Sequence, residues 1–84
     1  MTAQQGYNGW ANYETWNVHL WVTNDEGAYR SILAYREADG GEFDAAGASE
    51  CVKCLFPSGT PDMEGPSDYD KVDWVEVAEA LNEL

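Results

Sequence analysis

Basic side chains are almost missing from this sequence of 84 residues. Arg30, Arg36, Lys53 and Lys71 are the four basic residues, whereas sixteen residues are Asp or Glu, and the formal net charge is −12. Four basic side chains can pair with at most four carboxylates, so the other twelve must lie in water, because burying an unpaired carboxylate costs several kcal/mol. This balance argues against direct binding of DNA, RNA or an anionic membrane and favours a cationic partner.

Long apolar runs are also missing. No stretch approaches the roughly 20 apolar residues of a membrane span, and the N-terminal sequence MTAQQGYNG is polar and has no apolar run typical of a secretory signal. We therefore expect a cytoplasmic protein in which Cys51 and Cys54 are reduced. A chain of this length predicts a single domain over residues 1–84, with residues 1–8 as a flexible lead.

Candidate metal ligands and catalytic groups are few. His19 is the only histidine, and Cys51 and Cys54 form one CxxC pair with no second pair to complete a zinc site. No Ser/His/Asp triad, phosphate-binding loop or dinucleotide motif is present. The sequence therefore predicts a protein that is not an enzyme and has no cofactor or metal, with both cysteines as small buried residues. A small metal or redox protein that uses Cys51 and Cys54 is an alternative.

Aromatic residues are plentiful and concentrated. Three of the four tryptophans lie between Gly9 and Trp21. Because a buried Trp or Tyr removes roughly 150–250 Å² from water, we expect these side chains to build the core, with Trp10 only partly buried. In the alternative interpretation, Tyr7, Trp10 or Tyr69 is exposed as an anchor in an interface.

Two helices are predicted in the N-terminal half. Asn12 is a good N-cap for a helix over residues 13–23. Either Asn24 or Asp25 can cap a second helix, which Gly40–Gly41 ends. Trp16 and Leu20 share one face of the first helix, and Val18, Trp21 and Val22 widen its apolar side, so we expect a well-buried helix. On the second helix the expected apolar stripe is Ala28, Ile32 and Tyr35.

The C-terminal half predicts a helix over residues 44–56, with a strand over 50–56 as the competing interpretation. Residues 57–71 read as an acidic loop rich in Pro and Gly, which is functional or mobile. Asp73 and Glu76 form a capping box at the start of a last helix. The fold class predicted is mainly α, a small bundle of three to four short helices, with a short β element in the middle as the alternative. The expected apolar faces are Ala45, Ala48, Val52 and Leu55 on the third helix and Trp74, Val77, Ala78, Leu81 and Leu84 on the last.

The surplus carboxylates are the candidate partner-binding surface. A net charge of about 2–8 in magnitude is enough to keep a small domain soluble, and a larger charge destabilises the fold by repulsion. Carboxylates spaced like phosphates can occupy a cationic groove built for DNA or RNA. The predicted binding residues are Asp62, Glu64, Asp68, Asp70, Asp73, Glu76, Glu79 and Glu83, together with Glu37, Asp39, Glu42 and Asp44 around Gly40–Gly41.

Three strings carry a resemblance to a known group of proteins: NYETWNV at residues 12–18, LW at 20–21 and DWVEVA at 73–78. They resemble a family of small proteins from phages, plasmids and other mobile elements. By analogy with acidic proteins from that setting, the resemblance implies an inhibitor of a host defence complex. The expected partner is a CRISPR effector or, second, a restriction enzyme, whose DNA- or RNA-binding groove is blocked. An adaptor that binds a host protein through an exposed aromatic patch is the alternative.

Overall fold

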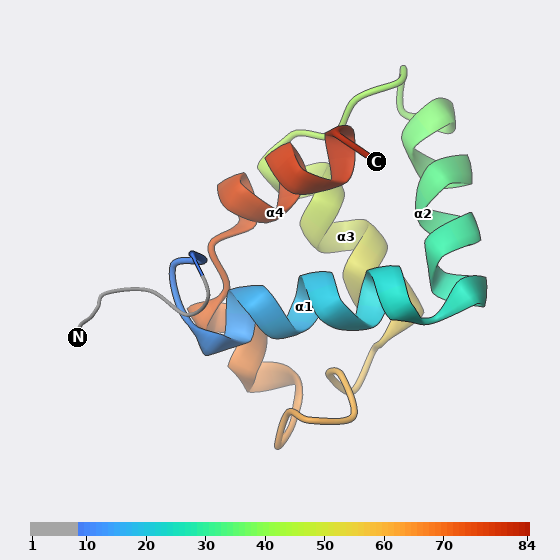
Figure 1. Cartoon of the computed structure of the whole chain (residues 1–84). Coiled ribbons are helices and arrows are strands. Elements are labelled where there is room, and N and C mark those ends of the chain that lie inside the picture. Colours follow the sequence, from blue (N-terminus) through green and yellow to red (C-terminus); the bar gives the residue numbers. More distant parts are fainter. Residues whose placement is uncertain (1–8) are drawn as a thin grey trace.

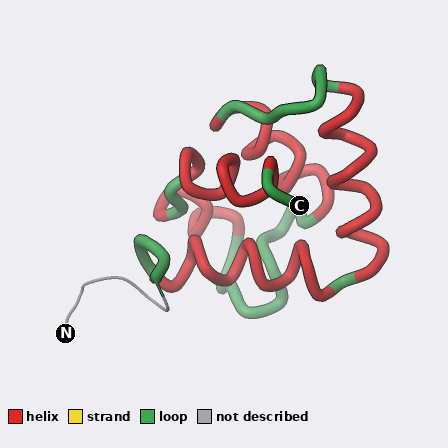
Figure 2. The backbone as a smooth tube through the Cα atoms, turned by 45° about the horizontal axis from the view of Figure 1, so that its top comes forward, coloured by secondary structure: helices red, strands yellow, loops and turns green. Residues whose placement is uncertain are grey.

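The computed structural model describes residues 9–84, which form a helical bundle without a β-strand (Figures 1 and 2). This confirms the mainly α class and excludes the strand over 50–56. The predicted lead at residues 1–8 lies outside the described part of the chain. No helix between residues 9 and 84 combines the length and the apolar character that crossing a membrane requires. The elements are α1 (Tyr13–Asn24), α2 (Glu26–Ala38), α3 (Ala45–Leu55), the 3₁₀ helix η1 (Pro66–Lys71) and α4 (Trp74–Asn82).

Short polar side chains start each of the four α-helices. Asn12, Asp25, Asp44 and Asp73 each accept a hydrogen bond from a backbone N–H in the first turn of the helix that follows. Three of these caps are carboxylates, which the positive end of a helix dipole stabilises. Residues Gly40–Gly41, which follow α2, adopt φ values of 92° and 93°, a conformation that favours glycine. The helix starts and the glycine stop predicted from the sequence are confirmed.

Helix α1 crosses the middle of the molecule, as Figure 1 shows. Helix α4 lies on one side of it and η1 on the other, while α2 stands across its C-terminal end and α3 fills the space behind. Buried apolar side chains from all five elements meet in one core. The core residues are Val18, Val22, Ile32, Phe43, Ala48, Cys51, Val52, Tyr69, Val72, Val77, Ala78 and Leu81.

The tryptophans do not build this core, contrary to the prediction. All four are only partly buried, and Trp74 packs against the edge of the core. Trp21 lies at the boundary because its indole Nε1 donates a hydrogen bond to Asp62 Oδ2 at 2.9 Å, a polar contact that favours a position near water. The residues that α1 buries are Thr15, Asn17, Val18 and Val22.

The segment over residues 57–71 is not entirely a loop. Its second half forms η1, which begins at Pro66 and buries Tyr69 to 2% exposure. The Tyr69 hydroxyl donates to the carbonyl of Phe56 at 2.5 Å, and burial raises its pKa to about 12. The prediction of Tyr69 as an exposed anchor is therefore wrong. Tyr69 is buried because its side chain contacts the end of α3. The sequence around Tyr69 does not contain this distant contact, so it could not be predicted from that sequence.

Candidate functional site

The carboxylates of the protein lie at its surface. Thirteen of the sixteen are exposed, and the other three are half-buried. Two ion pairs join them to basic side chains: Arg30 to Glu26 at 3.4 Å and Lys71 to Asp68 at 3.7 Å. Exposed pairs of this kind contribute little to stability.

The other two basic side chains make different contacts. Arg36 Nη1 donates to the carbonyl of Leu81 at 2.7 Å, and Lys53 Nζ lies 5.9 Å from the ring centres of both Tyr69 and Trp74. Fourteen carboxylates therefore have no basic partner among the described residues, two more than the sequence alone required. The net charge of −12 is the same whichever groups pair, but two further carboxylates carry their charge without a neighbouring cation.

Two glutamates of α4 and Glu83, which follows it, line one open hollow on the surface. Glu76, Glu79 and Glu83 line a hollow of about 240 Å³ together with Trp10, which lies just before α1. Glu76 Oε1 accepts a hydrogen bond from the backbone N–H of Ala11 at 2.8 Å, so it fixes the chain before α1 against α4. The cleft thus presents carboxylates beside an indole ring, a combination that attracts cations.

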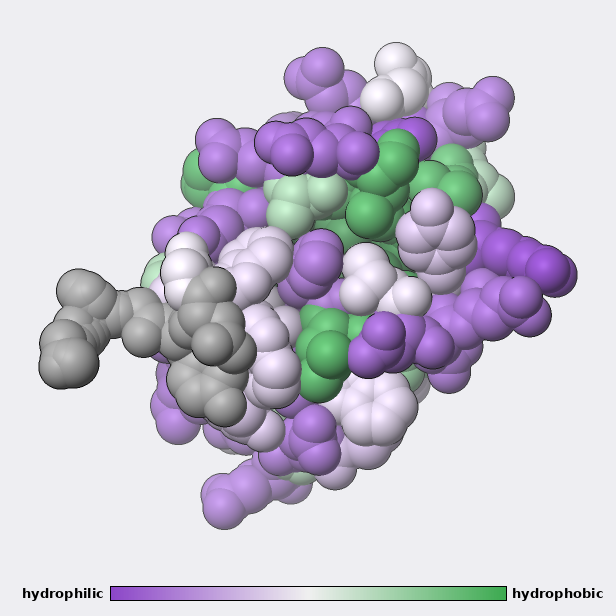
Figure 3. Space-filling model, in the orientation of Figure 1, coloured by the Kyte–Doolittle hydropathy of each residue, from purple (hydrophilic) through white to green (hydrophobic). Residues whose placement is uncertain are grey.

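The connection between α2 and α3 continues this anionic surface. Asn82 accepts a hydrogen bond from the Phe43 N–H at 2.7 Å and donates to the Phe43 carbonyl at 2.9 Å. Because Glu42 and Asp44 flank Phe43 and Glu83 follows Asn82, the two backbone segments that carry these carboxylates lie side by side. Figure 1 shows this connection beside the C-terminal end of α4, and Figure 3 shows hydrophilic surface over the same region. We name this surface the acidic ridge: Asp39, Glu42, Asp44, Glu76, Glu79 and Glu83.

Asp39 belongs to the ridge through its neighbour at the start of α3. The Asp39 Oδ2 and Asp44 Oδ1 atoms lie 2.9 and 3.1 Å from the position that a Cβ on Gly47 would take. Two carboxylates from opposite ends of the α2–α3 connection therefore approach the first turn of α3. The positive end of the helix dipole stabilises both of them.

The predicted set of twelve carboxylates is not one continuous surface. Four of its members, Asp62, Glu64, Asp68 and Asp70, precede α4 and lie on the opposite side of α1 from the ridge (Figure 1). Asp73 lies between the two groups and caps α4. Glu37 is exposed on the last turn of α2, two residues before Asp39, and its side chain makes no hydrogen bond or ion pair within residues 9–84.

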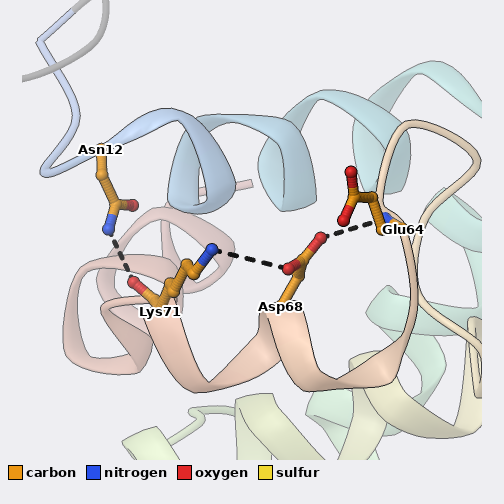
Figure 4. Close-up of polar contacts among 4 residues, drawn as sticks. All are labelled: Asn12, Glu64, Asp68 and Lys71. Atoms are coloured by element: carbon orange, nitrogen blue, oxygen red, sulfur yellow. Dashed lines mark hydrogen bonds and ion pairs between the residues drawn. The ribbon is translucent and has the colours of Figure 1, made fainter.

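Two of the acidic residues in the segment before η1 and within it, Asp62 and Asp68, have structural contacts. Asp62 Oδ2 accepts hydrogen bonds from Asn17 Nδ2 and Trp21 Nε1, both at 2.9 Å, and these bonds lower its pKa below the ordinary value. Asp68 Oδ2 accepts from the Glu64 N–H at 3.0 Å, while its other oxygen pairs with Lys71 (Figure 4). These side chains hold the segment before α4 in place.

Sequence reasoning missed the buried polar residues of the NYETWNV string. Thr15 Oγ1 donates to Asn12 Oδ1 at 2.6 Å and accepts from the Asp73 N–H at 2.9 Å. Asn12 Nδ2 also donates to the Lys71 carbonyl at 2.6 Å (Figure 4). Asn17 is fully buried and accepts a hydrogen bond from the Thr60 hydroxyl. The signal in the sequence was a set of polar residues interleaved with apolar ones on a helix. These polar residues hold α1 against residues 60–73.

The cysteines differ from each other. Both thiols are free, but Cys51 is buried and Cys54 is exposed, so the prediction of two buried residues is wrong for Cys54. Burial, and then the neighbouring Cys54, raises the pKa of Cys51 to about 11.

His19 packs on the ring of Trp10 with ring centroids 4.6 Å apart, and burial lowers the pKa of His19. Nowhere in the described chain do three His, Cys, Asp or Glu side chains gather as metal ligands would.

Comparison with known proteins identifies the family of the chain. The model of a family described as "Family of unknown function (DUF7249)" matches residues 3–84. The match covers both ends of the chain, which carry the NYETWNV and DWVEVA strings, and the middle with the CxxC pair. Nothing among curated proteins or solved structures matches the chain.

Proposed function

The chain belongs to the family of unknown function DUF7249, and we propose that it is a non-enzymatic inhibitor whose acidic ridge occupies the cationic groove of a nucleic-acid-binding protein. The ridge carries the proposal, because it joins six carboxylates from two separate segments. Arg36, the basic side chain that reaches this end of α4, donates to a backbone carbonyl and neutralises none of them. The protein itself binds neither nucleic acid nor membrane.

The electrostatics favour such a partner. An anionic surface speeds its encounter with a positive groove and penalises acidic partners by like-charge repulsion. Because salt screens exposed charges, binding should weaken strongly as ionic strength rises. The resemblance to proteins of mobile elements adds the setting: a host defence complex, with a CRISPR effector as the first candidate and a restriction enzyme as the second.

The experiment measures release of fluorescently labelled DNA or RNA from a panel of purified CRISPR effectors and restriction enzymes. The parent protein should displace the nucleic acid from at least one of them. A variant with Glu42, Glu79 and Glu83 all changed to Lys should lose about tenfold or more of this activity. The matched control changes Glu37, Glu64 and Asp70 to Lys, which alters the net charge equally but leaves the ridge intact. If both triple variants lose activity equally, or if no member of the panel responds, the proposal fails.

A second candidate function is an adaptor that binds a host protein through aromatic side chains. It is supported by Trp10, which lines the cleft beside α4, and by Tyr35, which is 46% exposed. Such binding depends on apolar contact more than on charge, so it should survive high salt and respond to Trp10→Ala. A binding constant that is unchanged between low and high salt favours the adaptor over the nucleic-acid mimic.

A further inference from the structure

A second hollow, of about 180 Å³, lies between α2 and α3 next to the ridge. The rings of Tyr35 and Phe43 line it, with the carboxylates of Asp39 and Glu50 and the thiol of Cys54. Its volume is below the roughly 300–1,000 Å³ of pockets that take drug-sized ligands. A single side chain of a partner is therefore an occupant of suitable size.

The pocket depends on a glycine inside a helix. Gly47 lies in the first turn of α3, where Ala would be more favourable by about 1 kcal/mol. A Cβ at this position would lie 2.9 Å from Asp39 Oδ2 and 3.5 Å from Phe43 Cδ1. Because Gly47 has no side chain, the Asp39 carboxylate and the Phe43 ring can both lie against this part of α3.

Tyr35 is exposed, contrary to the prediction that it is buried. It continues the stripe of Ala28 and Ile32 on α2, and both of those residues are buried. The end of this stripe faces the hollow and not a neighbouring helix, so the Tyr35 ring remains 46% exposed. The result is an aromatic wall beside two carboxylates, with no basic residue among the side chains that line the pocket.

We propose that this pocket takes one arginine side chain of the cationic partner. The guanidinium would stack on the Tyr35 ring and donate hydrogen bonds to Asp39 and Glu50. Arginine fits this set better than lysine, because its planar group combines stacking with several directed donors, whereas an ammonium is a strongly hydrated point charge. The inference rests on the proposed function because it requires a basic partner. It adds that the protein recognises one arginine side chain of that partner.

Cys54 supplies a reporter of occupancy. Both cysteines line the pocket, but Cys54 is exposed, whereas Cys51 is buried and its pKa is raised to about 11. Since the thiolate is the reactive form, alkylation at neutral pH should take place at Cys54 in the folded protein. A side chain that fills the pocket should slow this reaction.

The test measures the alkylation rate of Cys54 by mass spectrometry in the presence of capped oligo-arginine or oligo-lysine of equal length. Oligo-arginine should slow the reaction about fivefold more than oligo-lysine does. The difference should fall in Gly47→Ala, whose added methyl group would crowd the Asp39 carboxylate at the pocket wall, and it should fall in Glu50→Gln, an exposed substitution that does not threaten the fold. Glu64→Gln, with the same loss of charge on the other side of α1, should behave like the parent.

Two results would overturn the proposal: equal protection by both peptides, or full protection retained in Glu50→Gln. Failure here is distinguishable from failure of the proposed function. If the protein displaces nucleic acid from a defence complex but oligo-arginine gives no selective protection of Cys54, the pocket inference alone is wrong.

Discussion

Asn17 and Asp62 are 45 residues apart in the sequence, and the side-chain amide of Asn17 donates to Asp62 Oδ2 at 2.9 Å. Asn17 is fully buried, and Trp21 donates to the same carboxylate oxygen from the next turn of α1. Unpaired, the buried amide of Asn17 would cost about 1–3 kcal/mol. One acidic residue of the predicted binding set therefore also fastens the segment after α3 to α1.

This contact predicts a pH-dependent contribution to stability. The hydrogen bonds from Asn17 and Trp21 lower the pKa of Asp62 below 3.8 in the folded state. The contribution is therefore complete above the pKa of the unfolded state and is lost as the pH falls through the lowered pKa. In urea unfolding at a series of pH values, Asp62→Asn should differ most from the parent near neutral pH and approach it in acid.

The control for that series is Asp70→Asn, which removes an exposed charge for which no hydrogen bond or ion pair is found in the described chain. It accounts for the general effect of net charge on unfolding. If Asp62→Asn and Asp70→Asn follow the same pH profile, the two hydrogen bonds contribute nothing specific.

Thr15 is a second buried polar contact that can be tested. It is fully buried, and its hydroxyl joins Asn12 before α1 to the Asp73 N–H before α4. Thr15→Val keeps the shape but leaves the Asp73 N–H without its acceptor, so the free energy of unfolding should fall by about 1–3 kcal/mol. Thr23→Val is the matched control, because the Thr23 hydroxyl donates only to carbonyls of its own helix. A loss of equal size in the two variants would contradict the role of Thr15.

The starts and stops of the helices could be predicted from the sequence because their causes are local. Asp25, Asp44 and Asp73 bond backbone N–H groups three residues ahead, so a short window of sequence contains both partners. Gly40–Gly41 ends α2 through its own backbone conformation. Tertiary contacts changed only one such detail. Glu76 was expected to complete the capping box by accepting from the Asp73 N–H, but it accepts from Ala11 instead.

The buried face of α1 could not be predicted in this way. Trp16 and Leu20 on one side and Val18 and Val22 on the other are all apolar, so periodicity alone does not choose between them. The choice depends on Thr15, whose partner Asp73 is 58 residues away, and on Asn17, whose partner Asp62 is 45 residues away. In a hydrophobicity pattern, these two polar residues indicate an exposed face of the helix. The prediction therefore placed the indoles on the opposite face, in the core.

The acidic surface was partly predictable. The surplus of carboxylates follows from counting residues, and their exposure follows from the cost of burying them. Their division into the ridge and a second group across α1 does not follow, since it depends on the pairing of Asn82 with Phe43. The pocket could not be predicted because a glycine inside a helix indicates only a weaker helix, whereas the effect of Gly47 is to leave room for Asp39 from a preceding segment.

The pairing of Asn82 with Phe43 makes the ridge depend on one amide side chain. Asn82→Ala removes both hydrogen bonds that hold the α2–α3 connection against α4. We expect the free energy of unfolding to fall by about 1–3 kcal/mol, and displacement of nucleic acid to weaken, because Glu42 and Asp44 would no longer be held beside Glu83. Asn24→Ala, at the exposed end of α1, should change neither quantity by as much. Full binding activity in a destabilised Asn82→Ala protein would show that ridge continuity is unnecessary.

Repulsion within the ridge predicts that binding and stability oppose each other. Glu79 lies in the last turn of α4, and Glu83 is the residue that caps its C-terminal end, where negative charge faces both neighbouring carboxylates and the negative end of the helix dipole. Changing both to Lys should therefore raise the free energy of unfolding by about 0.3–1 kcal/mol at low salt, while it weakens binding to a cationic groove. Because added NaCl screens the same repulsion, the parent should gain more stability from salt than this double variant does. Urea unfolding at low and high NaCl measures both effects. If the double variant is less stable than the parent at low salt, Glu79 and Glu83 stabilise the fold. The idea that the protein keeps these carboxylates for binding although they destabilise it would then be wrong.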